Sequence, residues 1–374
     1  MVKIPRKIFS FFVSLLILTS QPKVKTRAID PITIGVGYAI ANIGTRALTK
    51  IGLFIGAFQS VNPEINRTMK EYYDSINVEY EEIREDVDGK SVVIGRKYWC
   101  NRALDHSLEN INVIFFSGNG GSVLNDEFHL GVNGKLIYLM QKGATVYAID
   151  YRGFGNRKFW LGPFSMSEDT IFADGEKTFQ YVLDRSEGKK IVLFGYSMGG
   201  QILMHVWRYT QEKAVESKLA GVILHSPLNN FNKVAGKIFR PLEWLLNVMF
   251  INISSFKELK NIKPTSVPSY WYSGYTEGIS EFVDMITTVC GLPYIDMQPS
   301  EAAQKVKQTL EDMGIMNAHV VMNKASHLAN HNFEKTTYEG LDNHNFKTPT
   351  TDGEIDEMDE YKKVVDVMAD FARS

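Results

Sequence analysis

The feature that most constrains the fold is a short glycine-rich turn, Gly195-Tyr196-Ser197-Met198-Gly199. Residues 191–194, just before it, are apolar and predict a buried strand, whereas residues 198–209 have helical periodicity. A sharp turn from strand to helix strains the backbone of the serine, and glycines on both sides leave room for neighbouring chain. We therefore expect Ser197 at the apex of a strand–turn–helix unit. The alternative is a structural glycine-rich turn without chemistry.

The alternation of strand and helix continues along most of the chain. Residues 78–87 and 91–99 predict a hairpin that turns at Asp88-Gly89. The further predicted strands are 112–116, 145–149, 190–194, 221–224, 267–272 and 319–322. The predicted helices are 134–141, 167–183, 198–209, one from about residue 279, and 361–372. Such alternation forms parallel β-α-β units, so we expect an α/β fold, with a mostly parallel central sheet and helices on both faces.

Two stretches interrupt this alternation. Residues 227–262 carry a group of large apolar side chains between 239 and 250, which predicts a small helical cap. Residues 331–357 are rich in Asn, Thr, Asp and Glu, and predict a solvated polar insertion. We expect both stretches to be insertions in one domain that spans residues 76–374.

The first 75 residues have a different character. Lys3, Arg6 and Lys7 precede the apolar run 8–18, which is shorter than the roughly 20 residues that span a bilayer. This pattern predicts a signal peptide or an N-terminal anchor within residues 1–30, and therefore an exported or membrane-associated protein.

A second apolar stretch follows within residues 31–75, and it predicts helical structure. It allows two interpretations, a helix packed on the protein or a segment that lies at a membrane interface, with Arg46 and Lys50 as its cations.

Composition excludes several other classes of protein. Of the 374 residues 44% are hydrophobic, which is too many for a disordered chain. The formal net charge of −2 does not favour nucleic-acid binding, which depends on neutralising phosphates. Two cysteines, Cys100 and Cys290, are too few for a disulfide scaffold or a cysteine-rich zinc module, although one disulfide can form.

The turn and a second motif give the chain a resemblance to the α/β-hydrolase superfamily. Residues 150–155, Asp-Tyr-Arg-Gly-Phe-Gly, are similar to a segment of monoacylglycerol-lipase-like and peptidase-like serine hydrolases, and residues 195–199 match the superfamily's nucleophile turn. The resemblance extends from about Val78 to the C-terminus. It implies the α/β-hydrolase fold, Ser197 as the nucleophile, and a structural role for Arg152 in pairing with carboxylates.

The superfamily places its catalytic base after the last strand, and this chain has a histidine there. His327 follows the predicted strand 319–322, so the resemblance implies that it accepts the Ser197 proton and later protonates the leaving group. His331 and His344 are later alternatives. The other histidines precede Ser197 or lie in or beside other predicted elements: His106, His129, His205, His225 and His319.

The acid of the triad follows the preceding strand in the superfamily, usually as His-Gly-x-x-Asp. This chain has Ser273-Gly274-Tyr275-Thr276-Glu277 there, so the resemblance implies that Glu277 accepts the second imidazole N–H and fixes the tautomer. Glu281 and Asp284 are nearby alternatives.

The resemblance also implies an oxyanion hole made of two backbone amides. One belongs to Met198, after the nucleophile, and the other to Asn119, in the loop Ser117-Gly118-Asn119-Gly120-Gly121, where the superfamily often has His-Gly. This loop lacks the Gly-Lys-Ser/Thr of a phosphate-binding loop. His327 and His331 lack the glutamate of a zinc-binding His-Glu-x-x-His motif. We therefore expect no cofactor and no metal.

Together these features predict a serine hydrolase that cleaves carboxylic esters through an acyl-enzyme on Ser197. The apolar stretch between 239 and 250 and the apolar N-terminal segments favour small-molecule or lipid-like esters as substrates and association with a membrane. The alternatives are an acyltransferase or a peptidase with the same triad, or a binding protein that retains the fold without catalysis.

Overall fold

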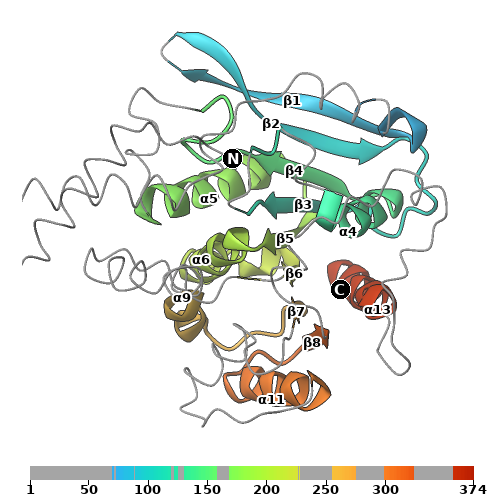
Figure 1. Cartoon of the computed structure of the whole chain (residues 1–374), viewed down its shortest axis with the longest axis vertical. Helices are drawn as coiled ribbons and strands as arrows, with labels where there is room; N and C mark the ends of the chain where they lie inside the picture. The colour runs from blue at the N-terminus through green and yellow to red at the C-terminus, as the bar shows by residue number, and fades with distance from the viewer. Residues whose placement is uncertain are drawn as a thin grey trace, which may run out of the picture. The chain divides into compact units, whose positions relative to one another are not determined.

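The computed structural model describes residues 70, 73–87, 89–118, 122–124, 130–157, 168–225, 227, 255–274, 299–323 and 357–374. All of them lie in one compact unit, Thr49–Ser374. Within this part of the chain, eight strands form a single sheet in the order β1-β2-β4-β3-β5-β6-β7-β8 (Figure 1). The predicted N-terminal segments 1–30 and most of 31–75 lie outside the described residues, as do most of the cap 227–262 and nearly all of the polar insertion 331–357.

The strands confirm the predicted alternation. Their bounds are β1 Val78–Val87, β2 Lys90–Cys100, β3 Ile111–Phe116, β4 Thr145–Ile149, β5 Lys190–Tyr196, β6 Leu219–His225, β7 Ser269–Gly274 and β8 Ala318–Asn323. The pairs β1–β2 and β2–β4 are antiparallel, and all other neighbouring pairs are parallel. The β1–β2 turn uses Gly89 at a φ of 75°, and its amide donates to the Asp86 carboxylate at 2.8 Å.

Helices cover both faces of the sheet. The α-helices are α4 Leu130–Gln141, α5 Glu168–Leu183, α6 Met198–Glu212, α9 Ser255–Asn261, α11 Pro299–Asp312 and α13 Glu357–Arg373, and a 3₁₀ turn, η4, spans Glu216–Lys218. Buried side chains of α5, α6, α9 and α11 pack on one face, and those of α4 and α13 on the other. In Figure 1, α5, α6 and α9 accordingly lie on the opposite side of the strands from α4 and α13.

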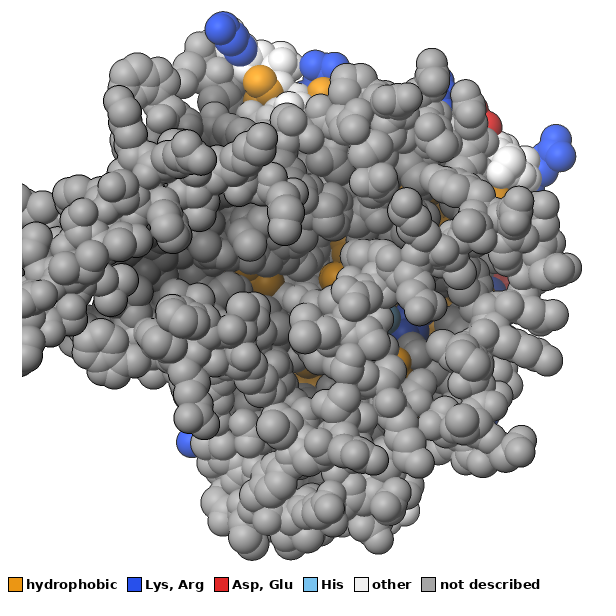
Figure 2. All heavy atoms as spheres, in the orientation of Figure 1, with side chains coloured by type: hydrophobic (Ala, Val, Ile, Leu, Met, Phe, Trp, Pro, Cys, Tyr) orange, Lys and Arg blue, Asp and Glu red, His pale blue; other side chains and the backbone are white. Residues whose placement is uncertain are grey.

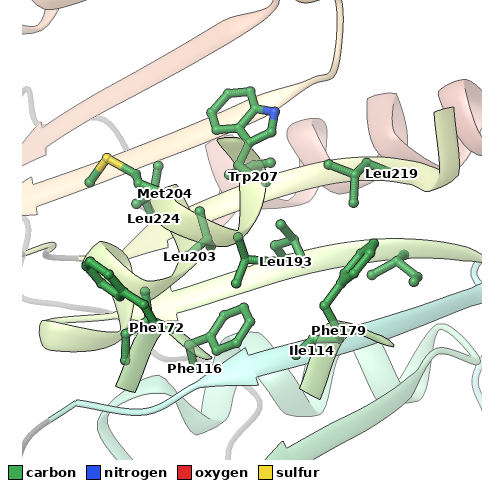
Figure 3. Close-up of a cluster of buried hydrophobic side chains, with 14 of the residues drawn as sticks. Ile114, Phe116, Phe172, Phe179, Leu193, Leu203, Met204, Trp207, Leu219 and Leu224 are labelled. Carbon is green, nitrogen blue, oxygen red and sulfur yellow. The ribbon is translucent and has the colours of Figure 1, made fainter. Parts of the chain in front are cut away.

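Strand β3 shows why the sheet is covered on both sides. All six of its residues are buried; Ile114 and Phe116 belong to one apolar cluster, and Val113 and Phe115 to the other. Successive side chains of a strand point to opposite faces, so a strand that is buried on both sides requires a helix layer on each face. Figure 3 shows the first cluster, in which Trp207 of α6 lies among side chains that come from both strands and helices.

The surface of the described residues is charged around the hairpin. Figure 2 shows Lys and Arg side chains standing out at the top of the view, over β1 and β2. Exposed ion pairs there include Arg84 with Glu82 at 2.6 Å and Lys97 with Glu81 at 3.6 Å. Such pairs contribute at most about 1 kcal/mol each. Cys100, at the end of β2, is a free thiol.

The helices differ from the prediction at one place. Helix α11 was not predicted, and the helix expected from about residue 279 falls outside the described residues. None of the described helices combines the length and the apolar character needed to cross a bilayer. Membrane association therefore stays a prediction from the sequence.

Candidate active site

Ser197 stands at the predicted apex, between the last residue of β5 and the first of α6. Its φ of 53° and ψ of −119° put a residue with a side chain in a strained backbone region. Its amide donates to the carbonyl of His225 at 3.1 Å, which ties the turn to the end of β6. Only 6% of Ser197 is exposed, so the surrounding structure holds the serine in this conformation.

The glycines of the turn are required by backbone contacts. A Cβ at Gly199 would overlap the carbonyl of Phe116 and lie 2.8 Å from the carbonyl oxygen of Ser117. A Cβ at Gly195 would lie 2.7 Å from the carbonyl oxygen of Gly199. These contacts are closer than real Cβ atoms make, so the motif packs the start of α6 directly against the end of β3.

The loop after β3 lies beside the nucleophile. A Cβ at Gly118 would approach the Cβ of Ser197 to 3.1 Å, so a side chain here would crowd the nucleophile. Met198, the other expected source of an oxyanion donor, is the first residue of α6, and amides in a first helical turn lack acceptors within the helix. Asn119 lies outside the described residues. The structure thus brings together the two backbone segments from which the donors were predicted.

His225 is a neighbour of the nucleophile that the sequence did not single out. Its imidazole lies 5.4 Å from the ring of Tyr196 and 4.8 Å from that of Tyr272, edge to face in both cases. The three residues are in register across β5, β6 and β7, so their side chains share one face of the sheet. In the sequence, His225 could be recognised only as a residue at the end of a predicted strand. The order of the strands in the sheet is needed to show that this strand lies beside β5.

His205, by contrast, belongs to an ionic network away from the turn. Its Nε2 lies 2.8 Å from a carboxylate oxygen of Glu176, and its Nδ1 lies 3.4 Å from that of Glu258. Its ring stacks on Phe172 at 4.2 Å. Burial lowers the pKa of His205, but the bonds to Glu258 and Glu176 outweigh burial, and the net pKa is raised. This histidine links α5, α6 and α9.

The remaining members of the predicted triad are not placed by the described residues. Glu277 and His327 lie outside them, as do the alternatives Glu281, Asp284, His331 and His344. The strands that precede Glu277 and His327 are described, because β7 ends at Gly274 and β8 at Asn323. Both strands run parallel to β5, so their C-terminal ends lie at the same edge of the sheet as Ser197.

A buried lysine lies close to this edge. Lys135 of α4 is 4% exposed, and its Nζ lies 4.4 Å from the ring centre of Tyr272, 5.9 Å from that of Tyr270 and 5.6 Å from that of Tyr361. Burial lowers the pKa of Lys135 to about 7. Ring faces attract a cation, so the three tyrosines favour the charged form in a site that otherwise disfavours it.

Arg152 has the structural role that the resemblance implied. Its Nε and its backbone amide each donate to the buried Asp174 carboxylate at 2.7 Å, and a terminal nitrogen donates to the carbonyl of Thr170. These bonds fasten the segment after β4 to α5. As for metals, the described residues contain no group of three His, Cys, Asp or Glu side chains that could hold an ion.

Comparisons with known proteins find one matching family model and several similar solved structures. The family model of the S33 serine aminopeptidases matches residues 133–277, which include the Ser197 turn and Arg152. The chain is similar to the solved structure of an esterase named E25, at 15% identity over 83% of this chain and 82% of that one, with a TM-score of 0.47.

Two further structures are similar at comparable levels. A brefeldin A esterase, described as a bacterial homologue of human hormone-sensitive lipase, is 13% identical over 88% of this chain and 93% of its own, with a TM-score of 0.47. An esterase/lipase from an uncultured bacterium is 11% identical over 96% and 97%, with a TM-score of 0.42.

Proposed function

We propose that the chain is a serine hydrolase with the α/β-hydrolase fold, and that it cleaves carboxylic esters through an acyl-enzyme on Ser197. One observation carries the proposal: Ser197 is held in a strained conformation at the strand–helix turn, with the backbone of Gly118 against it. A serine held this way presents its hydroxyl at the sheet edge where loops from several strands meet.

The proposed reaction has two steps. The Ser197 hydroxyl attacks the ester carbonyl while His327 accepts its proton, and the amides of Met198 and Asn119 stabilise the oxyanion. His327 then protonates the departing alcohol, which leaves an acyl group on Ser197. In the second step His327 deprotonates a water that attacks the acyl-enzyme, and the carboxylic acid leaves as the serine is reprotonated. Glu277 accepts the other imidazole N–H throughout and stabilises the imidazolium.

The topology supports His327 as the base. Neighbouring strands lie about 4.8 Å apart, so β8 is about 14 Å from β5, across β6 and β7. His327 follows the end of β8, Asn323, by four residues, which span up to about 14 Å when extended. The loop after β8 is therefore long enough to bring the imidazole to Ser197, and Glu277 has a shorter distance to cover from β7.

Lipid-like esters and membrane association are supported by the sequence alone. The apolar residues between 239 and 250 would line a site for an acyl chain, and the apolar segments before residue 76 would hold the enzyme near lipid. On the same grounds we propose that the protein is exported or membrane-associated.

The test is a panel of p-nitrophenyl esters of increasing chain length. We expect hydrolysis with a preference for long acyl chains, its loss in Ser197→Ala, and its retention in Ser186→Ala, in which the lost hydroxyl donates to the Leu183 carbonyl far from the turn. Activity confined to acetate esters would contradict the lipid substrate.

The same panel separates the alternatives. Activity that Ser197→Ala retains in full would contradict the nucleophile. Faster turnover on peptide amides, or transfer to an added alcohol in preference to water, would favour a peptidase or an acyltransferase. A wild-type chain that hydrolyses nothing and reacts with no fluorophosphonate would favour a binding protein.

A further inference from the structure

Two consecutive residues directly after β4 bind the loop that follows β3. Strand β4 pairs with β3 in parallel, with Ala148 opposite Phe115, so Asp150 and Tyr151 emerge beside residues 117–124. Residues 119–121, in the middle of that loop, lie outside the described residues. Its two ends are described, and each is bound by one member of the Asp150-Tyr151 pair.

Tyr151 binds the near end. Its phenol donates to the carbonyl oxygen of Ser117 at 3.0 Å, and its ring packs edge to face on Phe154 at 5.7 Å. The side chain is 2% exposed. Burial raises the pKa of Tyr151, so the phenol keeps its proton and remains a donor over the whole working range of pH.

Asp150 binds the far end. One carboxylate oxygen accepts from the Ser122 hydroxyl at 2.5 Å, and the other accepts from the Val123 amide at 2.7 Å. The Ser122 hydroxyl in turn accepts from the Leu124 amide at 3.0 Å. Asp150 is 1% exposed, and Gly155 lies so close that an added Cβ would overlap the carboxylate.

The bound loop is the one that contacts the nucleophile turn. The Ser117 carbonyl that accepts from Tyr151 is also one of the groups that a Cβ at Gly199 would meet, and Gly118 lies against Ser197. A buried, desolvated carboxylate is an expensive way to hold a loop, because apolar packing could do it without desolvation. Directional bonds to a hydroxyl and an amide instead fix where the backbone lies.

We propose that Asp150 and Tyr151 are positioning residues for the hydrolytic reaction, which fix the two described ends of the loop after β3 relative to Ser197 so that its predicted donor, the Asn119 amide, meets the oxyanion. This inference rests on the proposed function. Neither residue is proposed to touch the substrate. Removal of one oxyanion donor lowers kcat by about 10²–10³-fold. Displacing a donor without removing it should lower kcat by less than its removal does. We therefore expect about a 10–100-fold loss in kcat, with KM nearly unchanged.

The experiment compares Asp150→Asn, Tyr151→Phe and Ser122→Ala with the wild type. The control is Glu258→Gln, a buried carboxylate in α9 that binds Arg208 at 2.7 Å and makes no bond to the described ends of the loop. We measure kcat per active site titrated with fluorophosphonate, KM on p-nitrophenyl butyrate, the Ki of phenylboronic acid, which forms a tetrahedral adduct with a reactive serine, and the urea midpoint.

The expected result is a fall in kcat and a matching rise in the boronic acid Ki for Asp150→Asn, with a smaller effect of the same kind for Tyr151→Phe. The double variant Asp150→Asn with Ser122→Ala should lose less transition-state stabilisation than the two single variants added together, because the two residues share one hydrogen bond. The Glu258→Gln control should lose stability and keep kcat within about twofold of the wild type.

An unchanged kcat per titrated site in Asp150→Asn, or an effect on KM alone, would overturn the positioning role while leaving the proposed function intact. A wild-type enzyme that neither hydrolyses esters nor takes up fluorophosphonate would overturn both. If Asp150→Asn does not fold, the positioning role is tested with Tyr151→Phe and Ser122→Ala, by their kcat per titrated site and their Ki for the boronic acid.

Discussion

Replacing Gly199 by alanine should separate catalysis from stability at the nucleophile turn. The added methyl group would overlap the Phe116 carbonyl and lie 2.8 Å from the Ser117 carbonyl oxygen, whereas ordinary contacts of a Cβ begin at 3.4 Å. Both obstacles are backbone atoms, so no side chain can rotate away. Either the end of β3 or the start of α6 must move.

The magnitudes differ for stability and for rate. Overpacking costs about 1–3 kcal/mol, and alanine regains about 1 kcal/mol over glycine inside a helix, so the net loss of stability should be about 0–2 kcal/mol. A misplacement of about 1 Å in a reactive group, however, can cost about 10²-fold in rate. We therefore expect kcat/KM for p-nitrophenyl butyrate to fall about 10–100-fold in a protein that is still folded.

The matched control is Gly175→Ala in α5. Its added Cβ would lie 2.6 Å from a methyl group of Ile202 and 3.1 Å from one of Val206, which is milder crowding than at Gly199 and is against side chains of α6. Gly175→Ala should show a comparable change in the urea midpoint and keep kcat. If Gly199→Ala is folded and its kcat stays within twofold of the wild type, the packing explanation of the turn is refuted.

Two further predictions concern the pH dependence of stability. Because burial lowers the pKa of Lys135 from 10.5 to about 7, the unfolded chain binds a proton that the folded chain lacks between these values, and stability should rise with pH there. The free energy of unfolding in urea of the wild type should rise by at most about 3 kcal/mol relative to that of Lys135→Met between pH 7 and pH 9.5. A difference between the two proteins that does not change with pH would contradict this. The raised pKa of His205 has the opposite consequence: its charged ring, bonded to Glu176 and Glu258, stabilises the fold below pH 6.5, and this contribution is lost as pH rises through the raised value. The advantage of the wild type over His205→Gln, about 1–3 kcal/mol at pH 6, should therefore shrink by pH 9 and not grow.

Much of the sheet could be predicted because its signals are local. The five-residue strand β4 has the predicted bounds, and Gly89 of the predicted hairpin turn lies between β1 and β2. Helix α11 was missed because it is mostly polar and buries only one narrow face, including Val306 and Leu310. Apolar runs, on which the prediction relied, do not reveal such a helix.

The candidate site was predictable only in part for the same reason. The Ser197 turn is encoded within a few residues, and the structure confirms its strand-before, helix-after setting. The position of His225 beside it depends on strand order and register, which no local pattern contains. The burial of Lys135 was not predictable either, because a lysine is normally assigned to the surface. Its tyrosine neighbours come from β7 and α13, which lie far along the chain, so no local pattern reveals them. Glu277 and His327 remain predictions.

The most direct test of the account is mass spectrometry of the protein after reaction with a fluorophosphonate. We predict a single adduct per chain on the peptide that contains Ser197, no adduct in Ser197→Ala, and labelling slowed by orders of magnitude in His327→Ala. An adduct on a different serine, or an undiminished rate of labelling without His327, would contradict the account.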